Sequence, residues 1–225
     1  IFVAQVPTTG NDSVVDIIDV SVPDQPARLG TIQGTYRPYD VAVKDSILYV
    51  AANDSGLLIF DVHDPSSPRR IFQLFGNSGR YWGVALVNSY AYVDRIDTFF
   101  VLNVSNPSLP TVIGRFGRNY GSFSNIDLSV AYPFVYWAEG SLGAIDVSDP
   151  ARPVERSRFS GYDWIDGVAA KGNIVAATDA SQGVWILRND LLTSVDDKRR
   201  NSLPESFELY QNYPNPFNAQ PTVEF

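Results

Sequence analysis

Short runs of hydrophobic, β-branched and aromatic residues recur along the chain, and polar segments rich in proline, glycine and asparagine separate them. No segment shows the sustained spacing of apolar residues that marks an amphipathic helix. Runs of about five to eight residues with this composition are typical of β-strands. The pattern therefore predicts an all-β chain built from many short strands.

A turn with two prolines recurs at a nearly constant distance. Its four copies begin with Asp or Asn followed by Val, and they span residues 19–26, 61–68, 103–110 and 146–153. The first prolines fall at 23, 65, 107 and 150, so the intervals are 42, 42 and 43 residues. A period of about 40–45 residues is that of a β-propeller blade, a sheet of four antiparallel strands. One blade cannot bury both its faces alone, so neighbouring blades have to pack around an axis.

Each repeat contains four strand-like runs, which we expect to lie in order from the axis to the rim. The innermost run starts after Asp40, Gly83, Asp127 or Asp166. The second runs are rich in tyrosine and β-branched residues and span 1–5, 47–52, 90–95, 134–139 and 174–178. The third runs span 15–20, 57–62, 99–104, 142–147 and 183–187. A fourth run follows each proline turn, for example 69–75 and 111–116.

These runs predict a β-propeller with five blades wholly or partly visible. The first blade lacks its innermost strand, and the last lacks its outermost strand. Because residue 1 is also not methionine, we expect the ring to continue upstream of Ile1. Irregular closure of the ring is the alternative.

Two stretches of the repeat resemble the LVIVD-repeat family. They are Tyr49-Val50-Ala51 in a second run, and Gly56-Leu57-Leu58-Ile59-Phe60-Asp61-Val62 before a proline turn. The similarity covers about residues 1–190, with departures at Asn103, Trp137 and Arg188. The resemblance implies a propeller, but it does not imply a reaction, because the family has no single established activity.

The composition changes after the repeats. Residues 191–203 include a charged polar run and are expected to form a linker. In the segment 204–225, the stretch Leu209–Asn218 resembles the opening of the C-terminal sorting domain of type IX secretion cargo, with Ala219 in place of the usual proline. This implies export by the type IX machinery to the surface or medium of a two-membrane bacterium, and only the start of the β-sandwich sorting domain is present. The alternative is a β-sandwich opening with no sorting role.

The composition excludes several kinds of site and partner. A net charge of −8 and a pI near 4.6 argue against nucleic acid, which needs basic patches. No apolar run is long enough for a transmembrane helix. The chain has no cysteine, which excludes disulfides, zinc–thiolate sites and cysteine nucleophiles. Its single histidine, His63, occupies a turn position held by serine in other repeats, so we interpret it as structural.

The loops at one end of the propeller carry residues suited to binding. The connections between repeats carry aromatic residues beside arginine, and those between second and third runs add carboxylates. Irregular loops on a rigid scaffold are where binding residues concentrate, and such residues suit a glycan or a protein ligand. The candidate ligand-binding residues are Arg37, Tyr39, Arg80, Tyr81, Trp82, Tyr120, Tyr162 and Trp164. The alternative is that these aromatic residues wedge between blades.

Asp40, Asp127 and Asp166 share one position of the repeat, where they could ring the axis and hold a cation such as Ca²⁺. The alternative, which we favour, is that they accept hydrogen bonds from backbone amides. No other cofactor is expected.

We therefore expect a non-catalytic binding or interaction module. A propeller enzyme, a hydrolase or lyase using these three aspartates and Arg80, is one rival hypothesis. A structural subunit of a surface layer or filament is the other.

Overall fold

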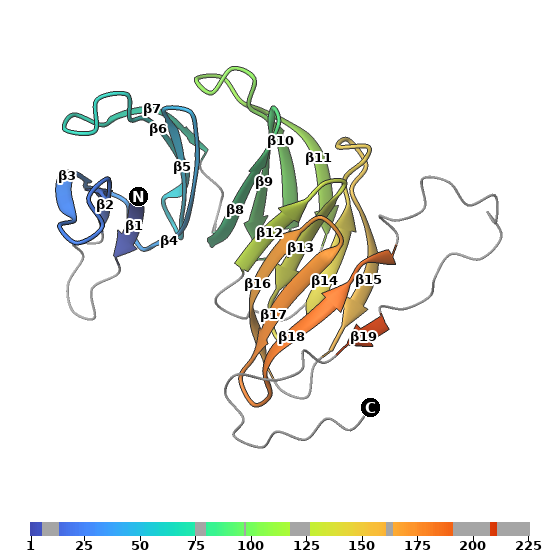
Figure 1. Ribbon diagram of the computed structural model, residues 1–225. Helices are drawn as coiled ribbons and strands as arrows, with labels where there is room; N and C mark the ends of the chain where they lie inside the picture. The colour runs from blue at the N-terminus through green and yellow to red at the C-terminus, as the bar shows by residue number, and fades with distance from the viewer. Residues whose placement is uncertain are drawn as a thin grey trace.

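The computed structural model describes residues 1–5, 14–74, 80–96, 98–117, 127–160 and 164–190, and the strand 208–210. Within these residues every named element is a β-strand, and the strands form five antiparallel sheets. Figure 1 shows the sheets following one another in chain order around an arc. The prediction of an all-β propeller with four-stranded blades is confirmed, and the first sheet has three strands, as expected for a first blade without its innermost strand.

The first sheet contains the strands β1 (Phe2–Gln5), β2 (Val14–Asp19) and β3 (Ala27–Ile32). The second contains β4 (Pro38–Lys44), β5 (Ile47–Ala52), β6 (Gly56–Asp61) and β7 (Arg69–Leu74). The third contains β8 (Tyr81–Val87), β9 (Tyr90–Arg95), β10 (Thr98–Asn103) and β11 (Thr111–Gly117). The fourth contains β12 (Asp127–Ala131), β13 (Phe134–Ala138), β14 (Leu142–Asp146) and β15 (Val154–Phe159). The fifth contains β16 (Ile165–Lys171), β17 (Ile174–Asp179), β18 (Gly183–Arg188) and β19 (Glu208–Tyr210).

The core lies between the sheets and not within any one of them. Four clusters of buried side chains occur, and each combines residues of two consecutive sheets. In the second sheet, for example, Leu58 packs toward the first sheet and Ile59 toward the third. Successive residues of a strand point to opposite faces, so one apolar run serves two junctions. Burying one such side chain stabilises the fold by about 1.5–3 kcal/mol, which is why each sheet depends on its neighbours.

Three of the innermost strands begin earlier than the sequence predicted. β4, β8 and β16 start at Pro38, Tyr81 and Ile165, before and not after the acidic or glycine position. Each strand has a register shift against its neighbour within its first three residues. Such a bulge lets the strand bend and take in an extra residue. The prediction placed these first residues in loops and was wrong.

The outermost strand of the last sheet comes from the tail. β19 pairs antiparallel with β18, joining Leu209 to Leu187 and Tyr210 to Ile186. The sequence had assigned these tail residues to a separate sorting domain and had left the last blade without its fourth strand. The rest of the proposed linker and sorting segment lies outside the described residues.

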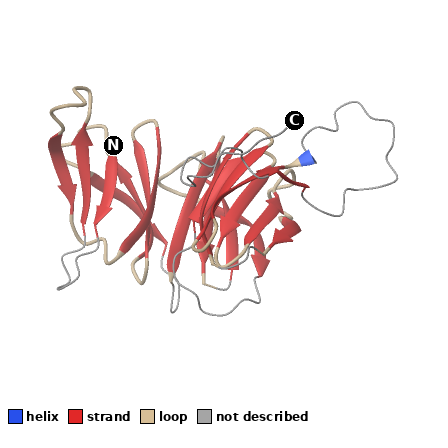
Figure 2. Cartoon of the chain, turned by 60° about the horizontal axis from the view of Figure 1, so that its bottom comes forward, coloured by secondary structure: helices blue, strands red, loops and turns tan. Residues whose placement is uncertain are grey.

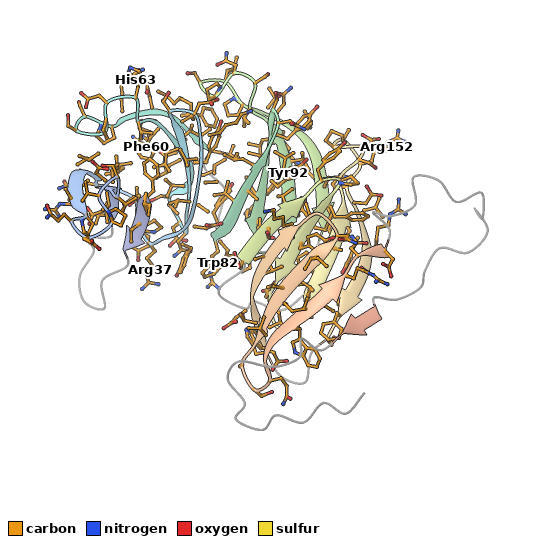
Figure 3. The ribbon with its side chains drawn as sticks, in the orientation of Figure 1. Arg37, Phe60, His63, Trp82, Tyr92 and Arg152 are labelled. Carbon is orange, nitrogen blue, oxygen red and sulfur yellow. The ribbon has the colours of Figure 1, made fainter. Side chains whose placement is uncertain are left out.

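The proline turns and the connections between repeats lie at opposite ends of the strands, on the two sides of the arc. His63 and Arg152 belong to proline turns and lie at one end, whereas Arg37 and Trp82 lie at the other (Figure 3). The strands run between these ends and make up most of the described chain (Figure 2). The two ends are called the proline-turn end and the connection end below.

Candidate functional site

The proline-turn end is held by one repeated hydrogen bond. The first side chain of each turn accepts the backbone amide two residues later, at 2.8–3.0 Å. The four pairs are Asp19 with Ser21, Asp61 with His63, Asn103 with Ser105, and Asp146 with Ser148. These are Asx turns, in which a short polar side chain replaces a backbone acceptor. Asn103 accepts the same hydrogen bond as the aspartates. His63 donates its backbone amide to Asp61, which agrees with the interpretation of His63 as structural.

The same turns also dock onto the preceding sheet. A Cβ atom at Gly30 of β3 would overlap the carbonyl oxygen of Pro65, and one at Gly114 of β11 would overlap that of Pro150. Both glycines therefore permit a close approach between the outer strand of one sheet and the proline turn of the next. This end of the molecule is occupied by structural contacts.

At the inner strands, two of the three candidate metal ligands bind backbone amides of the following sheet. Asp40 accepts the amide of Val84 at 2.8 Å and also that of its own neighbour Val41 at 2.7 Å. Asp127 accepts the amide of Val168 at 2.8 Å. Each carboxylate thus connects one sheet to the next, which is the alternative that the sequence analysis favoured.

These carboxylates are partly withdrawn from water. Burial raises the pKa of Asp40 to about 6, although the amides of Val84 and Val41 act in the opposite direction. Burial likewise raises the pKa of Asp127, against the amides of Val168 and Leu128. Both groups therefore hold their protons more tightly than a carboxyl in water.

The third sheet carries Gly83 at this position, and Asp166 occupies it in the last sheet. Asp166 is exposed and accepts the hydroxyl of Thr178 at 2.6 Å. Within the described ranges, no three His, Asp or Glu side chains group in a way that could hold a metal ion. The Ca²⁺ hypothesis gains no support from the geometry.

At the connection end, two arginines are exposed on neighbouring sheets. Arg37 precedes β4 in a left-handed conformation with φ of 48°, and its guanidinium lies 5.7 Å from the centroid of the Tyr36 ring. Arg80 is exposed immediately before β8, and its carbonyl oxygen accepts the amide of Ile96 at 3.1 Å. Because β4 and β8 are adjacent inner strands, both side chains lie on one side of the molecule.

Three of the aromatic candidates are buried or partly buried. Tyr81 and Trp82 are 2% and 4% exposed and belong to the clusters on either face of the third sheet. Tyr39 is partly buried, with its ring centroid 4.3 Å from that of Trp82. The expected exposure of Tyr81 and Trp82 is therefore incorrect, because the early start of β8 carries them into the strand, and they pack between sheets as the alternative proposed. Tyr81 shares a buried cluster with Val84, and Trp82 shares one with Ala85. This spacing of three comes from the bulge before Gly83, so the alternation of a regular strand could not have indicated it.

The remaining candidates fall into two groups. Trp164 is partly buried beside Gly140, and Tyr120 and Tyr162 lie outside the described residues. Of the carboxylates in the connections, Asp179 is 3% exposed and accepts the amides of Ser181 and Gln182, so it is structural. Asp54 is exposed.

Comparison with known proteins supports this architecture. The LVIVD repeat pattern matches residues 38–74, 78–117 and 121–160, more than half of the chain. A search of curated proteins found no match.

Three solved structures resemble this chain at 12% sequence identity. One is Sqt1 of Saccharomyces cerevisiae, with a TM-score of 0.61, covering 79% of this chain and 54% of that one. Another is the computationally designed Ika8 protein, with a TM-score of 0.60, covering 83% of this chain and 57% of that one. A third is the β-propeller domain of Cps50 (Swd1) from Myceliophteria thermophila, with a TM-score of 0.58, covering 78% of this chain and 62% of that one. The chain thus spans between half and two thirds of the length of these three structures. None of the described residues forms a helix able to cross a membrane.

Proposed function

The chain belongs to the LVIVD repeat family, and we propose that it is a non-catalytic interaction module that binds another protein at its connection end. A propeller with these repeats fits a binding role, because the repeated contacts hold the scaffold and leave the connections free to vary. The observation that carries the proposal is the exposure of Arg37 and Arg80 immediately before the inner strands of adjacent sheets.

The buried aromatic residues favour a protein over a glycan. A saccharide that stacks on a protein needs an accessible aromatic face, and Tyr81 and Trp82 do not offer one. Arginine is enriched at protein interfaces because its planar guanidinium binds carboxylates with two parallel hydrogen bonds. Exposed Arg37, which lies over the Tyr36 ring, and exposed Arg80 therefore suit an acidic protein segment, although Asp54 is also exposed at this end.

The inner carboxylates support binding rather than catalysis. An enzyme that used Asp40 and Asp127 would need their oxygens to face substrate or a metal. In the structure each carboxylate already accepts an amide of the next sheet. The proposal therefore rests on the surface of the connection end and assigns no reaction.

Peptide and glycan arrays probed with the full chain test the proposal. We expect binding to acidic peptides, and a loss of at least about tenfold in affinity when Arg37→Glu and Arg80→Glu are combined, because like charges then oppose each other. Arg152→Glu, an exposed arginine at the proline-turn end, is the matched control and should leave binding unchanged.

Two results would contradict the proposal. Binding that survives the double reversal, or that Arg152→Glu weakens equally, would separate the ligand from the connection end. Binding to glycans alone would replace the protein ligand by a saccharide.

The tail motif supports a second proposal, on location. The resemblance of Leu209–Asn218 to a sorting-domain opening favours export by the type IX machinery to the surface or medium of a two-membrane bacterium. In the bacterium that makes the protein, external protease should degrade it on intact cells, or it should be found in the medium. A strain without the export machinery should retain it. Retention inside the cell in both strains would overturn this proposal without affecting the binding proposal.

A further inference from the structure

One residue at the connection end departs from the repeat. In the third sheet, the residue after the second strand closes onto its own sheet, because the amide of Ile96 donates to the carbonyl oxygen of Arg80 at 3.1 Å. Asn53 follows β5 in the same way, but its backbone is left-handed, with φ of 26°. Its carbonyl oxygen accepts the amide of Tyr81, in the next sheet, at 3.3 Å. Such local departures from ordinary backbone conformation cluster at binding sites.

The side-chain oxygen of Asn53 lacks a hydrogen-bond partner among the described residues. Asn53 is only 7% exposed, and its Oδ1 atom is buried. Buried polar groups are nearly always hydrogen-bonded, so this oxygen requires a partner that the described part of the chain does not supply. An asparagine amide combines an acceptor with an NH₂ donor, and its last bond turns easily where no hydrogen bond fixes it. The amide can therefore meet a ligand that offers a donor and an acceptor together.

Asn53 lies between the two exposed arginines of the connection end. The β4–β5 ladder begins at Pro38 on one strand and ends at the residue before Asn53 on the other. Arg37 and Asn53 are therefore the next residues on the two sides. Asn53 also forms an isolated bridge with Tyr81, which Arg80 precedes. Neighbouring strands lie about 4.8 Å apart, so two strand spacings, about 10 Å, separate the backbones at Arg37 and Tyr81. The second and third sheets thus present arginine, asparagine and arginine in a row.

We infer that Asn53 binds a main-chain peptide group of an extended acidic segment, while Arg37 and Arg80 bind acidic side chains on either side of that group. This inference rests on the proposed function and adds how the segment is recognised. A peptide group offers an N–H and a C=O, which match the two ends of the asparagine amide. An extended segment advances about 3.3 Å per residue, so acidic residues about three positions apart reach both arginines. Each guanidinium then binds one carboxylate.

Asp54 limits the negative charge that this site accepts. It is exposed directly after Asn53, and the antiparallel bridge between Asn53 and Tyr81 places the backbone of Asp54 beside that of Arg80. Its carboxylate therefore repels an acidic ligand that the arginines attract. Asp54→Asn removes this repulsion, so it should tighten the binding of an acidic peptide by roughly two- to fivefold.

Synthetic peptides with two aspartates in a glycine–serine background test the inference, and calorimetry measures their affinity for the full chain. We expect the tightest binding where the aspartates are about three positions apart. N-methylation of this peptide then removes the N–H of one peptide group at a time. For the wild-type protein, one methylated peptide should bind at least about tenfold more weakly than its parent. Asn53→Gly should bind the two peptides equally, and glycine adopts the left-handed conformation of Asn53 without strain.

Asn88→Gly is the matched control. Asn88 is exposed in the turn between β8 and β9, at the far end of β8 from Arg80, and its φ of 51° is also left-handed. This variant should bind every peptide as the wild type does, and thermal melting confirms that both glycine variants are folded.

The outcomes separate this inference from the proposed function. Asn53→Gly that still discriminates against the methylated peptide, or affinity that changes neither with Asp54→Asn nor with the spacing of the aspartates, would overturn the inference alone. The proposed function would stand in that case as long as reversal of Arg37 and Arg80 abolishes binding. A chain that binds none of these peptides, or binding that survives the double reversal, would overturn both.

Discussion

The proline-turn end and the connection end differ in how regularly their residues repeat. At the proline-turn end, four turns make the same Asx hydrogen bond, and two of them dock onto a glycine of the preceding sheet. At the connection end, the residues before the inner strands differ from repeat to repeat, and Arg37 and Arg80 are exposed. Residues that recur at a regular spacing within this chain therefore make structural contacts. The candidate binding residues occur where the repeat is irregular.

The largest effect should come from filling the close approach at the proline-turn end. Gly114→Ala introduces a Cβ that overlaps the carbonyl oxygen of Pro150, and backbone cannot move aside as a flexible side chain can. We expect a loss of about 3 kcal/mol in the free energy of unfolding, measured by urea denaturation. Gly117→Ala in the same strand meets no atom within 4 Å, so its effect should stay within about 0.5 kcal/mol. Equal losses of stability in the two variants would show that the close approach of the Pro150 carbonyl does not cause the effect of Gly114→Ala.

Removing a carboxylate that joins two sheets should have the next largest effect. Asp127→Ala leaves the amide of Val168 without its acceptor, and an unsatisfied buried amide costs about 2 kcal/mol. Asp127→Asn keeps an acceptor oxygen and should recover part of that loss. Denaturation curves of the two variants provide the comparison. An alanine variant as stable as the asparagine variant would contradict the role of this bond.

The raised pKa of Asp40 predicts a dependence of stability on pH. Burial raises the pKa of Asp40 to about 6 in the folded protein, whereas an aspartate in an unfolded chain has a pKa of about 3.9. The contribution of Asp40 to the free energy of unfolding should therefore fall as the pH rises from about 4 to about 6 and stay level above it. After allowance for its partial exposure, the change should be on the order of 1–2 kcal/mol. Asp40→Asn does not titrate. The difference in the free energy of unfolding between wild type and Asp40→Asn, measured by urea denaturation across this pH range, therefore gives the contribution of Asp40. A difference that is constant with pH, or that changes in favour of the wild type, would contradict it.

The smallest effect should come from a single Asx turn. Asn103→Ala removes the acceptor for the amide of Ser105 at an exposed position, which should cost no more than about 1 kcal/mol. Asn103→Asp should be neutral, because aspartate makes this bond in the other three turns. Melting temperatures of the two variants distinguish these outcomes. A destabilising Asn103→Asp would mean that the turns are not equivalent.

Much of the fold could be predicted because its signals are local in the chain. The second runs 47–52 and 90–95 coincide with β5 and β9, and the proline turns separate the third and fourth strands as expected. The bulges that begin β4, β8 and β16 could not be predicted, since they depend on how an inner strand pairs with its neighbour. That error moved Tyr81 and Trp82 from the core to a surface in the prediction.

By itself, the sequence determined the repeat, the number of visible sheets and the order of strands within each, because periodic apolar runs and proline turns are properties of neighbouring residues. Only the tertiary structure decided which aromatic side chains are buried, which amides the inner aspartates bind, and that Glu208–Tyr210 pairs with the last sheet. The hydrogen bonds of the two aspartates join residues 44 and 41 positions apart, and the pairing of the tail with the last sheet joins residues at least 20 positions apart. Whether a residue faces a ligand or a neighbouring sheet is determined by that packing and not by its own chemistry.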